Sequence, residues 1–143
     1  MKAIGAKYPQ RYADGSWNWS HFRSKIEDYV DIESGEVTFG YACCADFVGM
    51  VLYYSGVLDA ETINSYNFHS QIGITNLMEG IGWTEVSYAD AQPGDVGTVN
   101  SPIYGHAFFM WENDTIFDEC MPEKNINPYH WQHMSEGRYW RAP

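Results

Sequence analysis

A chain of 143 residues with 45% apolar side chains is long enough to bury a core and too apolar to be disordered. Its 19 acidic and 8 basic side chains give a net charge of −11, which argues against nucleic acid as a partner because phosphate neutralisation needs clustered Lys and Arg. No apolar run approaches the roughly 18 residues of a membrane span, and "MKAIGAKYPQ" lacks the apolar core of a signal peptide. We expect one domain over residues 1–143, made in the cytoplasm.

The first predicted element is a helix over residues 19–30. Trp19, Phe22 and Ile26 follow helical spacing, and Asn18 or Ser20 is available as its N-cap. The segment "DIESGEVTFGYA" that follows has the composition of a loop.

A second helix is predicted to begin at Cys44 in "CADFVGMVLYYSG" and to end at Gly56, which suits a C-terminal cap. Apolar residues recur along it at helical spacing, which predicts one apolar stripe. The residues of this stripe are Cys44, Phe47, Val48, Val51 and Leu52.

The rest of the chain predicts a weaker helix over residues 70–79 and then strands. "QPGDVGTV" reads as a turn and a strand, "GHAFFMWENDTIFDEC" as a hairpin around an Asn113–Asp114 turn, and "GRYWRAP" as a final strand. Helices first and strands second favour an α+β fold, with helices packed on one face of a small antiparallel sheet.

Cys44 is the candidate nucleophile. The chain has three cysteines, and the adjacent pair Cys43–Cys44 rarely forms a bridge, so at least one thiol is expected to be free. A cysteine in the first turn of a helix faces unpaired N–H groups and the positive end of the helix dipole, and both stabilise a thiolate. The alternative for Cys44 is a buried small apolar residue; Cys43 points away from the stripe and is interpreted as a bystander.

His106 is the best placed of the five histidines to act as the base, because it follows Gly105 at the start of a predicted strand. An acidic group on the partner strand would orient its ring. A strict two-residue turn would put Glu119 on the face of His106, whereas one bulge would put Asp118 there. Cys44, His106 and one of these two acids form a plausible catalytic triad.

Three motifs resemble CHAP domains and the related NlpC/P60 domains, which are papain-like cysteine amidases and peptidases. "CADFV" resembles the nucleophile segment, "QPGDV" the turn and strand before the catalytic histidine, and "GHAFFMWENDTIFDE" the histidine hairpin. The resemblance covers about residues 17–120 and implies a papain-like core. It also implies hydrolysis of amide or peptide bonds in bacterial peptidoglycan, with no cofactor.

The chain departs from the NlpC/P60 pattern around the nucleophile, where Asp usually precedes the cysteine and Ser-Gly follows it. Cys43 and Ala45–Asp46 occupy these places here, which favours the CHAP side. NlpC/P60 spacing chooses Asp118 as the third residue, and CHAP patterns could choose Glu119. Tyr29 and Tyr41 are the candidates for an oxyanion-stabilising tyrosine.

Two other functions stay open. Cys120, His130 and His133 could hold zinc, but no Cys-x-x-Cys pair supports a metal site, and we expect none. The chain could also be a catalytically silent member of the fold that binds wall fragments or a protein.

We favour a peptidoglycan hydrolase acting on stem peptides or cross-bridges, as an endopeptidase or an N-acetylmuramoyl-L-alanine amidase. A phage endolysin or tail hydrolase, or a secreted antibacterial effector, would reach the cell wall after lysis, injection or secretion. The acidic charge suggests that a separate wall-targeting module or partner supplies affinity for the wall, and an inhibitor could keep the enzyme silent in its producer.

Overall fold

The computed structural model describes residues 25–28, 44–118 and 128–143. Three helices and five strands are found there. The helices are α2 (Cys44–Tyr54), α3 (Ala60–Asn64) and α4 (Gln71–Gly80). The strands are β1 (Thr84–Val86), β2 (Val96–Asn100), β3 (Gly105–Trp111), β4 (Thr115–Phe117) and β5 (Arg138–Arg141). Short 3-10 turns are η1 (Ile26–Asp28), η2 (Tyr88–Asp90) and η3 (Met134–Glu136).

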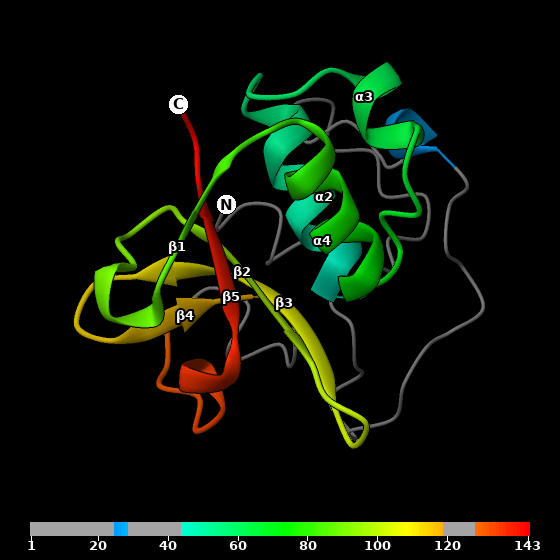
Figure 1. The fold of residues 1–143 in the computed structure, drawn as a ribbon. Helices are drawn as coiled ribbons and strands as arrows, with labels where there is room; N and C mark the ends of the chain where they lie inside the picture. The colour runs from blue at the N-terminus through cyan, green and yellow to red at the C-terminus, as the bar shows by residue number, and fades with distance from the viewer. Residues whose placement is uncertain (1–24, 29–43, 119–127) are drawn as a thin grey trace.

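The strands form one five-stranded sheet in the order β1-β5-β2-β3-β4, with every neighbouring pair antiparallel. Helices α2 and α4 lie side by side against it, α2 on β3 and α4 on β2 and β3 (Figure 1). This arrangement confirms the α+β class that the chain order predicts. Among the described residues, no helix is both long and apolar enough to cross a membrane.

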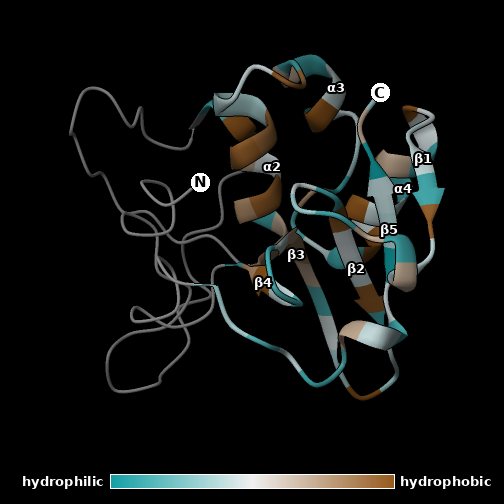
Figure 2. Ribbon diagram, turned by 90° about the vertical axis from the view of Figure 1, so that its left-hand side faces the viewer, coloured by the Kyte–Doolittle hydropathy of each residue, from teal (hydrophilic) through white to brown (hydrophobic). Residues whose placement is uncertain are grey.

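Helix α2 begins at Cys44, as its sequence predicts, and ends before Gly56. Gly56 has φ +76° and donates its N–H to Tyr53 O, because a residue in the left-handed region closes the helix. The expectation of a single apolar stripe was too narrow, since every residue of α2 from Cys44 to Leu52 is buried. Figure 2 shows apolar colouring on more than one turn of α2. The helix is covered on several sides because η1, α3, α4 and β3 all contact it.

The remaining helix predictions have mixed outcomes. The helix expected at residues 70–79 is α4, and Ser70 caps it by accepting the Gly73 N–H at 3.0 Å. The helix expected at residues 19–30 falls mostly outside the described residues, which show only η1 there. The short elements α3 and β1 have no counterpart in the sequence analysis.

The β3–β4 hairpin has the predicted position, and its register is informative. Trp111 pairs with Thr115, so three residues separate the last paired positions instead of two. Asn113 and Asp114 in this turn have φ of 57° and 54°, which their short polar side chains tolerate. Predicted strands at "QPGDVGTV" and "GRYWRAP" are confirmed as β2 and β5.

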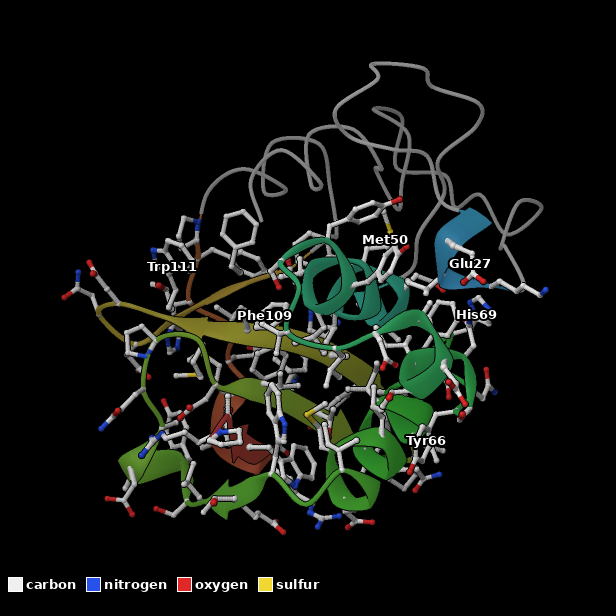
Figure 3. The ribbon with its side chains drawn as sticks, turned by 90° about the horizontal axis from the view of Figure 1, so that it is seen from above. Glu27, Met50, Tyr66, His69, Phe109 and Trp111 are labelled. Carbon is white, nitrogen blue, oxygen red and sulfur yellow. The ribbon has the colours of Figure 1, made fainter. Side chains whose placement is uncertain are left out.

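Two layers of apolar side chains hold the sheet. On the helix side, Phe47 of α2 packs against Phe109 and Phe117, with ring centroids 6.3 Å and 5.9 Å apart. Burying one such ring contributes about 1.5–3 kcal/mol. Figure 3 shows Met50 of α2 and Phe109 of β3 within this layer. The second layer contains Phe108 and Tyr139, whose neighbours are Val99, Met110, Ile116 and Met134.

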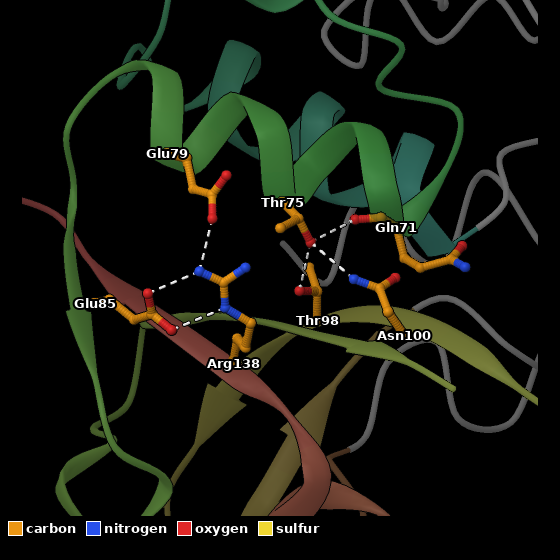
Figure 4. A network of polar contacts seen from close by, with 7 residues as sticks. All are labelled: Gln71, Thr75, Glu79, Glu85, Thr98, Asn100 and Arg138. Atoms are coloured by element: carbon orange, nitrogen blue, oxygen red, sulfur yellow. Dashed lines mark hydrogen bonds and ion pairs between the residues drawn. The ribbon is translucent and has the colours of Figure 1, made fainter. Parts of the chain in front are cut away.

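Polar contacts attach α4 to the sheet (Figure 4). The buried Thr75 and Thr98 hydroxyls are 2.8 Å apart, and Asn100 donates its amide to Thr75 Oγ1 at 3.2 Å. Arg138 of β5 binds Glu79 of α4 at 2.7 Å and Glu85 of β1 at 2.8 Å. These contacts hold α4 in place over β2, next to the strand that carries His106.

Candidate active site

Cys44 is the first residue of α2, at the end where backbone N–H groups have no helical partner. Cys44 is 8% exposed and forms no disulfide bond with another described residue. The thiol is hydrogen-bonded to the ring of His106. A thiolate formed there is stabilised by the helix N-terminus and by an adjacent imidazolium.

His106 is the second residue of β3, and its side chain is 12% exposed. Its Nε2–H donates to Oδ2 of Asp118, whose side chain is fully buried. Because Asp118 engages Nε2, Nδ1 is the ring nitrogen left to face the Cys44 thiol. The structure therefore brings together the three predicted side chains Cys44, His106 and Asp118, with His106 between the thiol and the carboxylate.

The hairpin register explains why Asp118 reaches His106. Phe109 pairs with Phe117, so position 118 lies opposite Phe108, which is on the same face of β3 as His106. The three-residue turn supplies the one-residue shift that the sequence analysis named as the condition for Asp118. Glu119, the other predicted acid, lies outside the described residues.

The electrostatics of His106 favour its charged form. Burial lowers the pKa of His106. The charges of Asp118 and Cys44, together with the hydrogen bonds of the ring to both residues, raise this pKa by more than burial lowers it. The pKa of His106 is therefore well above the usual value of 6.5. An imidazolium held between a carboxylate and a thiol favours a thiolate–imidazolium pair near neutral pH.

Tyr129 is a further contact of this group that the sequence analysis did not find. Its hydroxyl donates to Asp118 Oδ2 at 2.5 Å, the same oxygen that His106 contacts. Among the described residues, the buried Oδ1 of Asp118 has no hydrogen-bond partner. Sequence spacing gave no signal for Tyr129, because this residue belongs to a separate segment that pairs with β4 through an isolated bridge at Ile116.

Two aromatic rings pack against the ring of His106. The Trp131 ring lies 4.8 Å from the His106 ring between centroids, at an interplanar angle of 63°, and the Phe108 ring lies 5.6 Å away. These rings displace water from the imidazole, and electrostatic interactions are stronger where water is excluded.

A second acid–histidine pair joins the start of α2 to the segment before α4. His69 Nδ1–H donates to Asp46 Oδ1, and the Asp46 side chain is fully buried. Asp46 follows Cys44 by two positions, about 200° around the helix, so this pair lies on another side of α2. Its place next to the nucleophile turn makes it a structural support for α2. Figure 3 shows His69 on this side of the molecule, near Glu27.

Most of the other sequence-based candidates are not described by the structure. Cys43, Cys120, Tyr29 and Tyr41 lie outside the described residues. His133 Nδ1 contacts Glu136 at 2.6 Å, and the described ranges contain no group of three His, Cys, Asp or Glu side chains that could hold a metal ion.

A hollow of about 560 Å³ lies elsewhere, between η2 and the β3–β4 turn, and includes none of the three site residues. It is lined by Tyr88, Ala89, Ala91, Pro93, Met110, Trp111, Glu112, Asn113 and Asp114.

The chain matches no protein-family model, and searches of curated proteins and of solved structures find no significant match.

Proposed function

We propose that this protein is a cysteine hydrolase that cleaves an amide or peptide bond in bacterial peptidoglycan. The observation that carries the proposal is the group of Cys44, His106 and Asp118, in which the thiol at a helix N-terminus meets an imidazole held by a buried carboxylate. Nucleophile, base and orienting acid are the three parts that cysteine acyl transfer needs.

The proposed reaction has two steps. The Cys44 thiolate attacks the amide carbonyl carbon, and N–H groups at the start of α2 stabilise the oxyanion. The C–N bond breaks, the His106 imidazolium gives its proton to the leaving amine, and a thioester remains on Cys44. Water then attacks the thioester, with His106 taking one of its protons. The products are a carboxylic acid, which releases its proton to solvent, and the restored thiolate–imidazolium pair. Asp118 keeps Nε2–H oriented throughout.

The substrate class is supported by the motifs and by where they lie in the fold. "CADFV" opens α2, "QPGDV" leads into β2, and "GH" opens β3. These are the positions that the CHAP and NlpC/P60 resemblance assigns to them, which supports a papain-like core. We extend the proposal to stem peptides or cross-bridges as substrate, and to a protein that acts on the wall after release or delivery.

The experiment is digestion of purified peptidoglycans with different cross-link types, followed by mass spectrometry of the soluble fragments. Release of intact stem peptides would identify an N-acetylmuramoyl-L-alanine amidase, and new amino termini within stems or bridges would identify an endopeptidase. Absence of any new terminus from every wall, with the protein shown to be folded, would contradict the proposed substrate.

One observation favours a second function, a silent wall-binding or protein-binding member of the fold. Cys44 is 8% exposed, so access of a bulky substrate to its thiol is restricted. Iodoacetamide at neutral pH separates the two functions. Rapid alkylation of Cys44 supports the hydrolase, and an inert thiol supports the silent binding protein.

A further inference from the structure

We infer that Tyr129 is a positioning residue of the candidate active site, which acts through Asp118 to hold its carboxylate directed at His106. The inference deepens the proposed function, and it rests on that function only in assigning the group to catalysis. The thiol chemistry of Cys44 can be measured without any wall substrate.

The backbone fixes Tyr129 beside the hairpin. Ile116 of β4 and Tyr129 form an isolated antiparallel bridge, with the Ile116 N–H donating to Tyr129 O at 2.8 Å and the Tyr129 N–H donating to Ile116 O at 3.1 Å. Two hydrogen bonds at one position leave the Tyr129 backbone little freedom relative to β4. The Tyr129 side chain therefore contacts Asp118, two residues after Ile116, from a backbone that is held in place.

The Tyr129 hydroxyl is the hydrogen-bond donor in its contact with Asp118. An ionised carboxylate accepts and does not donate, so the Tyr129 O–H must point at Asp118 Oδ2. The Asp118 side chain is fully buried and Oδ1 has no partner among the described residues, so His106 and Tyr129 supply its hydrogen bonds there. Hydrogen bonds to the charged form of a buried acid favour that form.

The consequence passes from Asp118 to the thiol. Without the Tyr129 hydroxyl, Asp118 Oδ2 has one hydrogen bond fewer and its carboxylate is held less firmly against the His106 ring. The charge of Asp118 then raises the pKa of His106 less. Less imidazolium then remains to stabilise the Cys44 thiolate. Within the part of the chain that the structure describes, Cys44 from α2 and Asp118 after β4 contact the His106 ring, and Tyr129 contacts Asp118. His133 packs against the Trp131 ring and is paired with Glu136.

The test is the pH dependence of Cys44 alkylation by iodoacetamide in Tyr129→Phe, which removes the hydroxyl and keeps the ring. Fragment-ion mass spectrometry assigns the label to Cys44. We expect the onset of fast alkylation to move to higher pH, because less imidazolium remains to stabilise the Cys44 thiolate. On the acid side of this onset the alkylation rate should fall about tenfold, the effect of one hydrogen bond to a charged group.

Tyr88→Phe is the matched control. The Tyr88 hydroxyl also donates to a carboxylate, that of Asp114, but at the turn end of the hairpin. This bond raises the pKa of Tyr88 to about 12. Tyr88→Phe therefore removes the same kind of hydroxyl–carboxylate bond, at an exposed site. We expect the alkylation profile of Tyr88→Phe to match wild type.

The outcomes separate this inference from the proposed function. An unchanged alkylation profile in Tyr129→Phe would overturn the positioning role, even if the melting temperature of the variant falls. Wall digestion by wild type would in that case still support the hydrolase. An onset moved to higher pH in Tyr129→Phe, with no wall digested by wild type, would support the role of Tyr129 and contradict the proposed substrate. An equal shift of the onset in Tyr88→Phe would overturn the inference, because it would show a general effect on stability.

Discussion

Gly97, at the centre of the sheet, gives the sharpest test of the packing that supports His106. It pairs with Phe108 of β3 on one side and with Tyr139 of β5 on the other. The two rings meet across it with centroids 5.9 Å apart, at an interplanar angle of 66°. A Cβ at residue 97 would lie 2.4 Å from a Phe108 ring carbon and 2.9 Å from a Tyr139 ring carbon.

The magnitude follows from these distances. Carbon atoms in contact prefer about 3.5–4.0 Å, so the added methyl of Gly97→Ala overlaps the Phe108 ring by roughly 1 Å. Both rings are fully buried and cannot move aside without displacing their neighbours. Overpacking of this kind costs about 1–3 kcal/mol, offset by up to about 1 kcal/mol from the lower entropy of the unfolded Ala chain. We expect a net loss of about 1–2 kcal/mol in the free energy of unfolding.

Urea denaturation of Gly97→Ala beside Gly105→Ala measures this loss. A Cβ at residue 105 also clashes, at 2.1 Å, but with the end of the Gln71 side chain, which is half-buried and can rotate away. Neither glycine has a positive φ, so backbone strain does not separate the two variants. We expect Gly105→Ala to be within about 0.5 kcal/mol of wild type. A Gly97→Ala protein as stable as Gly105→Ala would refute the packing argument.

Four further outcomes are expected. In Asp118→Asn the pKa of His106 should fall, since the charge that raises it most is lost, and alkylation of the active-site thiol at pH 7 should slow. Because the pKa of His106 is raised on folding, the stability that its protonation contributes is complete below about pH 6.5 and is lost as pH rises through the pKa of the folded protein. Urea titrations at several pH values should therefore show an alkaline decline in the free energy of unfolding that Asp118→Asn lacks. Asp46→Ala should lower the free energy of unfolding by about 1–3 kcal/mol, because it breaks a buried hydrogen bond to His69; a change below 0.5 kcal/mol in urea titrations would contradict this. Arg138→Gln should cost less than about 1 kcal/mol by the same assay, since its ion pairs are half-exposed and screened, and a larger loss would contradict that reading.

Local patterns were enough to predict much of the fold. Helix α2, helix α4 and the β3–β4 hairpin follow from apolar periodicity and from turn residues near in sequence. The burial of α2 on several sides could not be predicted, because it depends on which elements later pack around the helix. Asp46 illustrates this: at a helix N-terminus it looks like a solvated first-turn acid, yet it is buried against His69.

The candidate site was predictable only in part, for the same reason. Cys44 and His106 stand at the start of their elements, where sequence is informative. The choice between two neighbouring acids depended on one residue of hairpin register, which the sequence left open and the pairing of Trp111 with Thr115 sets. Tyr129 reaches Asp118 because an isolated bridge pairs its backbone with Ile116, outside the regular hairpin pairing. No spacing rule predicts such a contact.

The most direct test of the central claim is the rate of wall cleavage by Cys44→Ala beside wild type, on a peptidoglycan that wild type digests. Folding of both proteins is checked by near-ultraviolet circular dichroism. The account predicts that the rate of appearance of new termini falls by about a thousandfold or more, since loss of a covalent nucleophile removes the acyl-transfer route. Cleavage by Cys44→Ala at a rate near that of wild type would contradict the account.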